Sequence, residues 1–137
     1  GDSKDKFKIV AQQDGGAALD KSMELAEDII TASPDMDAFF CINDPSALGA
    51  AAAIKAANKT GKIGVYSIDA SPDGKQALLD GEFTAVACQV PVQIADYSFK
   101  EAVKYVNGDT KIDEKKVYLD SHLVSKDEAE KTLKEWQ

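Results

Sequence analysis

Three polar side chains each follow an apolar run and precede a proline by two or three positions. They are Asn43 in INDP, Asp69 in IDASP and Gln89 in CQVP. The carboxyl ends of successive parallel strands meet at one edge of a sheet, where open sheets hold small ligands. An amide, a carboxylate and a second amide can donate to and accept from a polar ligand. The recurrence therefore predicts a shared binding site. The alternative, that each residue merely ends a strand, is common for any one of them.

The elements that must position these residues alternate along the chain. Strand patterns occupy residues 7–11, 38–42, 63–68, 84–88 and 117–124, helix patterns occupy 18–32, 46–57, 72–79 and 92–106, and a last helix opens at Ser125. The nearly all-apolar run 38–42 is typical of a strand covered on both faces. The sequence therefore predicts an α/β fold with an open, mostly parallel sheet and helices on both faces.

Local signals mark where the helices begin and end. Asp44, followed by proline, is expected to accept from the free N–H groups of the second helix, and Ser71 repeats this start for the third. Gly49 lies in an alanine-rich helix, which we expect to approach the sheet closely. Asn58 is the expected end of that helix.

Composition narrows the classes of function. With 137 residues, 44% of them hydrophobic, the chain can bury the core of one domain. A formal charge of −8 argues against a nucleic-acid surface, because phosphate contacts need clustered basic residues. No apolar stretch approaches the roughly 18 residues that a membrane span requires. Cys41 and Cys88 lie in apolar runs and are expected in the core, as neither a disulfide nor a metal pair.

Catalytic and metal-binding patterns are missing from the sequence. Gly15-Gly16 is too short for a phosphate loop and lacks a following Lys-Ser/Thr. His122 is the only histidine, and the sequence places no Ser or Cys nucleophile beside it, so a solvent-facing residue is expected. Spacings typical of metal ligands are absent as well. The sequence predicts neither an enzyme nor a bound cofactor or metal.

Three segments together resemble the C-terminal half of type I periplasmic binding proteins of the ribose and galactose group. The segments are FCIND with ALGA at 40–50, VYSID with SPDG at 65–74, and VACQVP at 86–91. The likeness covers roughly residues 7–125. It implies one lobe of that fold, Rossmann- or flavodoxin-like and incomplete. It also implies an extracytoplasmic sugar receptor that serves the membrane permease of an ABC importer. The expected location is periplasmic or extracellular, with a lipoprotein anchor in a Gram-positive source.

The resemblance implies roles for individual residues. In that family the positions matched by Asn43, Asp69 and Gln89 hydrogen-bond sugar hydroxyls. A buried carboxylate accepting from two vicinal hydroxyls makes strong charge-assisted bonds, so Asp69 is expected to carry the most affinity. Many relatives carry an aromatic residue and an Asp-Arg pair after the first strand, where this chain has Gln13 and Asp14. These two are further candidate contacts; the alternative is that they turn the chain and cap the next helix.

The same comparison implies two parts in the chain. Residues 1–90 correspond to a partial C-terminal lobe. Residues 91–137 correspond to a helix, a crossover strand and a C-terminal helix that pass between lobes. The N-terminal lobe and one central strand have no counterpart here, so the gap must be closed by direct pairing, by another copy in a homodimer, or by a companion fragment. We expect residues 91–137 to pack on this lobe or on a partner copy, burying Phe99 and Trp136.

The main alternative is the effector-binding domain of a LacI-type transcriptional regulator, which shares the fold. Such domains tend to carry a Leu-Thr-Thr-Val strand where this chain reads FTAVACQ at 83–89. The CQVP ending, the acidic balance and the lysine-rich last helix resemble secreted receptors instead. Residues 1–6 lack the apolar core of a signal peptide, so any such peptide is expected upstream. A chemotaxis or sensor-kinase partner stays open.

Overall fold

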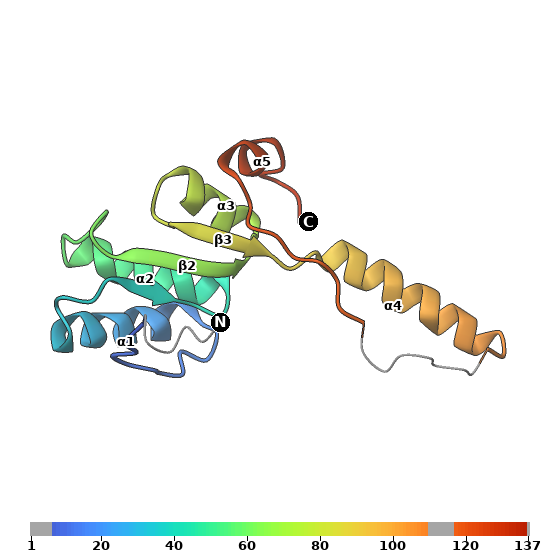
Figure 1. Ribbon diagram of the computed structural model, residues 1–137, viewed down its shortest axis with the longest axis horizontal. Coiled ribbons are helices and arrows are strands. Elements are labelled where there is room, and N and C mark those ends of the chain that lie inside the picture. The colour runs from blue at the N-terminus through green and yellow to red at the C-terminus, as the bar shows by residue number, and fades with distance from the viewer. Residues whose placement is uncertain (1–6, 110–116, 137) are drawn as a thin grey trace.

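The α/β class and the parallel sheet are confirmed. The computed structural model of the protein describes residues 7–109 and 117–136. Its elements, in chain order, are α1 (Leu19–Ala32), β1 (Ala38–Phe40), α2 (Asp44–Ala56), β2 (Gly64–Asp69), α3 (Pro72–Leu79), β3 (Ala85–Cys88), α4 (Pro91–Val106) and α5 (Lys126–Lys131) (Figure 1). Within this described part the strands form one sheet in the order β1-β2-β3.

The register brings the carboxyl ends of the strands to one edge of the sheet. Phe40 lies opposite Tyr66 across β1 and β2, and Asp69 lies opposite Cys88 across β2 and β3. Both pairings are parallel. The chain segments that follow all three strands therefore leave the sheet on the same side, as the spacing of the polar residues predicts.

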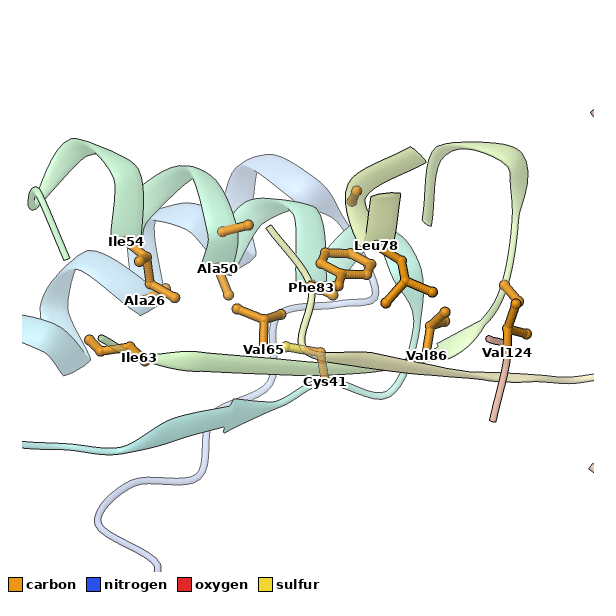
Figure 2. Packing of buried hydrophobic residues seen from close by; sticks show 14 of the residues in the cluster. Ala26, Cys41, Ala50, Ile54, Ile63, Val65, Leu78, Phe83, Val86 and Val124 are labelled. Carbon is orange, nitrogen blue, oxygen red and sulfur yellow. The ribbon is translucent and has the colours of Figure 1, made fainter. Parts of the chain in front are cut away.

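Within the described residues, helices cover one face of the sheet. Helix α2 contacts β1 and β2, α3 contacts β3, and α1 packs on α2. Val65 and Val86 point toward these helices and are buried, and Figure 2 shows them between the strands and the helical layer. On the other face, Phe40 is 73% exposed and Tyr66 41% exposed. The expectation of helices on both faces thus holds for one face of the described sheet.

Gly49 allows a close contact, but with a helix and not with the sheet. A Cβ atom at this position would lie 2.4 Å from the carbonyl oxygen of Leu19 and 2.8 Å from the backbone nitrogen of Met23. Both atoms belong to α1. The missing side chain therefore lets α1 and α2 pack backbone against backbone.

Two expected strands are wrong. Residues 7–11 form no strand, and Phe7 and Ile9 are 78% and 79% exposed. A strand requires a neighbour, and this segment does not pair directly with β1, so direct pairing does not close the gap. In segment 117–124 the structure has only an isolated antiparallel bridge between Leu123 and Ala87.

The expectation that the C-terminal part buries Phe99 and Trp136 is wrong in the single chain. Helix α4 extends away from the sheet and buries none of its residues (Figure 1). Phe99 is 70% exposed and Trp136 is 53% exposed. The segment before α5 packs along β3, and α5 packs against α3, so that Val124 and Ala129 are buried. Burial by a partner copy stays a prediction, and the expected charged connection 111–116 lies outside the described residues.

Both cysteines lie in the core, as predicted. Cys41 and Cys88 are buried and free. Burial raises the pKa of the Cys41 thiol to about 11. Across the described residues, no helix combines the length and the apolar character needed to cross a membrane.

Candidate ligand-binding site

Asp69 and Gln89 meet at the edge where β2 and β3 end. The Gln89 side chain donates from Nε2 to Asp69 Oδ1 at 2.7 Å. Their backbones also meet, with the Gln89 N–H 3.4 Å from the Asp69 carbonyl oxygen. The sequence reasoning is thus confirmed in placing this carboxylate and this amide together.

The backbone at this edge adopts conformations that L-residues rarely take. Asp69 has φ 130, Ala70 has φ 58 and Val90 has φ 51. Each such non-glycine residue costs on the order of 1 to 3 kcal/mol and persists only where packing enforces it. Ala70 and Val90 are buried, which supplies that packing. The sharp ends of β2 and β3 hold Asp69 and Gln89 in fixed positions at the carboxyl edge of the sheet.

Asn43 lies at the same edge and begins α2. Its Oδ1 accepts from the Ser46 N–H at 3.1 Å, and its Nδ2 donates to the Ala17 carbonyl at 3.2 Å. The residue that caps α2 is therefore Asn43, and the expectation that Asp44 does so is wrong. A side-chain amide has two N–H donors and two lone pairs on its oxygen, so Asn43 keeps one of each for a ligand.

Asp44 is the residue at this edge whose role sequence reasoning missed. Its carboxylate is buried and accepts from Ser67 Oγ at 2.6 Å, Ser71 N at 2.8 Å and Ser71 Oγ at 2.6 Å. A Cβ atom at Gly74 would lie 2.1 Å from Asp44 Oδ2, so α3 approaches this carboxylate closely. Asp44 thereby ties the start of α2 to the turn after β2. The positions of Ser67 and Ser71 in the sequence gave no sign of these contacts, because both serines lie far from Asp44 in the chain.

The backbone N–H of Asp44 connects this support to Asp69. It donates to Asp69 Oδ2 at 3.2 Å. The pKa of Asp69 is raised, mainly because burial removes the carboxyl from water; the Asp44 N–H opposes that rise and the Asp44 charge adds to it. A carboxylate that is partly withdrawn from water gains more from a ligand donor than one fully hydrated.

Gln13 and Asp14 are exposed, and their role as ligand contacts stays a prediction. Asp14 Oδ1 accepts from the Gly16 N–H at 2.8 Å, so Asp14 turns the chain, as the alternative expectation held. The capping part of that expectation is wrong, because Ala18 begins α1 without a side-chain cap. No hydrogen bond within the described ranges joins Gln13 or Asp14 to the carboxyl edge, although Ala17 in the same segment contacts Asn43.

A separate hollow lies at the opposite edge of the sheet. It has a volume of about 340 Å³ and is lined by residues at the amino ends of the strands, including Gly64 and Thr84, together with Lys55, Asp80 and Glu82. Lys55 and Glu82 form an exposed ion pair there at 3.4 Å. None of the sequence-predicted ligand residues lines it.

His122 has neighbours that the sequence did not predict. Its Nδ1 lies 3.4 Å from Cys88 Sγ, and its Nε2 lies 2.8 Å from Glu128 Oε1. The expectation that no cysteine lies beside it is therefore wrong. Its side chain is 52% exposed, so it also faces solvent.

Comparison with known proteins matches this geometry to one family. The model of the periplasmic binding protein domain matches residues 2–110. The chain belongs to this family. The ribose import binding protein of Salmonella typhimurium is 35% identical over 104 residues, which are 76% of this chain and 35% of that protein. The D-allose-binding periplasmic protein of Escherichia coli is 32% identical over 95 residues, 69% of this chain and 30% of that protein.

Solved structures of the family superpose closely on the chain. A galactofuranose binding protein has a TM-score of 0.83 at 33% identity and covers 92% of this chain. A solute binding protein of Actinobacillus succinogenes with bound D-allose has a TM-score of 0.83 at 26% identity and covers 90%. The matched region is 44% and 43% of those two structures, so this periplasmic binding protein domain spans less than half of either. These relatives are binding proteins and not enzymes, in agreement with the sequence prediction.

Proposed function

We propose that this domain supplies the sugar-contacting edge of one lobe of an extracytoplasmic receptor for an ABC importer. The observation that carries the proposal is the convergence of Asp69, Gln89 and Asn43 at the carboxyl edge of the sheet. A sugar offers adjacent hydroxyls that both donate and accept, and these three side chains provide matching groups.

The remaining bonding capacity of Asp69 suits two hydroxyls. Each carboxylate oxygen receives one protein donor, from Gln89 and from the Asp44 backbone. A carboxylate has about four lone-pair sites, so about two are left for ligand donors. Gln89 is exposed, which leaves its amide accessible from the open side of the edge.

The relatives favour the receptor over a LacI-type regulator. Those named above are a ribose import protein, an allose-binding periplasmic protein and a galactofuranose binding protein. Their names support a pentose or hexose as the ligand class and a periplasmic or extracellular location. A lipoprotein anchor would apply in a Gram-positive source.

Two uncovered surfaces of this domain support a further protein partner. We assign residues 1–90 to a partial C-terminal lobe and residues 91–137 to the segments that cross to an N-terminal lobe. Helix α4 buries none of its residues, and the face of the sheet around Phe40 and Tyr66 is exposed as well. Both observations support a partner that covers these surfaces. The N-terminal lobe of a longer protein is that partner, with a homodimer of this chain as the alternative. The permease of the importer would receive the closed two-lobed receptor.

Binding by the chain alone should be weak. A second lobe normally excludes water from the ligand, and without it each hydroxyl bond competes with solvent. We expect the longer parent protein to bind a sugar tightly and this chain to bind it weakly or undetectably.

Calorimetric titration of the parent protein with a panel of pentoses and hexoses tests the proposal. Asp69→Asn should weaken binding of the best ligand by about 1 to 3 kcal/mol, since it removes a charged acceptor from a partly buried site. Asp73→Asn is the matched control, because Asp73 is an exposed residue in the first turn of α3. Equal affinities for both variants would refute the proposed role of Asp69, and a parent that binds no sugar would refute the ligand class.

A further inference from the structure

A second cluster of reactive groups lies beneath α5, away from the exposed side of the carboxyl edge. It consists of Cys88 at the end of β3, His122 in the segment before α5, Glu128 in α5 and Lys75 in α3, and we call it the thiol cluster. Cys88 and Lys75 are fully buried. Cys41, the other buried cysteine, lies outside this cluster and serves as its internal comparison.

The order of contacts in the thiol cluster suits proton removal from Cys88. Glu128 Oε1 lies 2.8 Å from His122 Nε2, which favours a proton on that nitrogen and leaves Nδ1 as an acceptor. Nδ1 lies 3.4 Å from Cys88 Sγ. A thiol in contact with a base has the parts needed for activation.

Lys75 is held by backbone carbonyl groups that follow α5. Its ammonium donates to the carbonyl oxygens of Thr132 at 2.8 Å and Glu135 at 2.7 Å. Burial lowers the pKa of Lys75, while the charges of Glu135, Glu128 and Cys88 act to raise it.

We propose that Cys88 is a modification site, a thiol that reacts with small uncharged electrophiles because His122 takes its proton. The proton moves from Sγ to His122 Nδ1, and the sulfur then attacks the electrophilic carbon. The S–C bond forms as the bond to the leaving group breaks, and the leaving group departs with the electron pair. His122 afterwards releases its proton to water.

Access to the buried sulfur requires α5 to open. This helix has only six residues, and so short a helix opens locally at little cost. His122 stays beside Cys88 when α5 leaves, because the Cys88 N–H donates to the His122 carbonyl at 3.0 Å and the Val124 N–H to the Val86 carbonyl at 2.9 Å. The reactive pair is thus held by β3 and not by the helix that covers it.

Alkylation by iodoacetamide, mapped by mass spectrometry of the native chain between about pH 5 and about pH 9, tests the proposal. At neutral pH we expect Cys88 to react about tenfold or more faster than Cys41. The burial-raised pKa of Cys41, about 11, makes that thiol the unreactive reference.

Variants separate activation from simple exposure. His122→Gln should slow Cys88 labelling at neutral pH about tenfold or more, because it removes the base. Ser125→Ala removes the cap of α5 and should speed Cys88 labelling, because it favours opening of the helix. A variant that unfolds is recognised by fast labelling of Cys41. No native labelling of Cys88, labelling of Cys88 no faster than that of Cys41, or a labelling rate that His122→Gln leaves unchanged would overturn the proposal. None of these outcomes depends on sugar binding.

Discussion

The buried carboxylate of Asp44 should be the main polar contributor to the stability of the carboxyl edge. It is 1% exposed and accepts three hydrogen bonds, from Ser67 Oγ at 2.6 Å and from Ser71 N and Oγ at 2.8 and 2.6 Å. Asp44→Asn keeps the shape of the side chain and one acceptor oxygen. Its amide nitrogen, however, points an N–H donor at the Ser71 N–H. The Ser71 hydroxyl can rotate to accept instead, so the main loss is one unpaired buried N–H.

The expected loss of stability in Asp44→Asn follows from those hydrogen bonds. An unpaired buried donor costs about 1 to 3 kcal/mol, and replacing a charged acceptor for Ser67 by a neutral one costs about 1 kcal/mol more. We therefore expect Asp44→Asn to lower the free energy of unfolding by about 2 to 4 kcal/mol. With a urea slope of about 2 kcal/mol per M, the midpoint should fall by about 1 to 2 M.

Urea unfolding of the chain, followed by circular dichroism, measures this shift. Asp73→Asn is the control, since Asp73 is exposed and contributes only a helix-terminus interaction of at most about 1 kcal/mol. The reasoning is refuted if the two variants unfold at the same urea concentration. It is also refuted if Asp44→Asn leaves the midpoint of the parent chain unchanged.

Two further predictions concern helix packing and acid stability. Gly49→Ala should destabilise the chain by about 1 to 3 kcal/mol in urea unfolding, because its Cβ would lie 2.4 Å from the Leu19 carbonyl oxygen; an unchanged midpoint would contradict the close contact. The hydrogen bond from His122 lowers the pKa of Glu128, and burial opposes this effect. A lowered carboxyl pKa stabilises the fold above its unfolded pKa, and the gain is lost as pH falls through the folded pKa. Glu128→Gln should therefore lose less stability on acidification than the parent chain, and equal acid profiles would contradict this.

The parallel core of the fold could be predicted from the sequence because its signals are local. Apolar runs marked β1, β2 and β3, and prolines with preceding polar residues marked the helix starts. Parallel register then places the residues after each strand at one edge, so Asp69 and Gln89 could be paired without coordinates. Ser71 and Ser125 were likewise correct as helix caps.

The errors come from contacts between distant parts of the chain. Residues 7–11 and 117–124 have strand patterns, but a strand forms only beside a partner, and no local signal shows whether one is present. Asn43 and Asp44 are both good caps, and only the support from Ser67 and Ser71 decides between them. The Cys88–His122 contact spans 34 positions, and the chain path that creates it has no sequence signature.

A crystal structure of the longer parent protein with the best sugar from the titration panel tests the central claim most directly. We predict that sugar hydroxyls lie about 2.5 to 3.2 Å from the side chains of Asp69, Gln89 and Asn43, with Asp69 accepting from two of them. A sugar bound at another surface, with these three side chains bonded only to protein or water, would contradict the account.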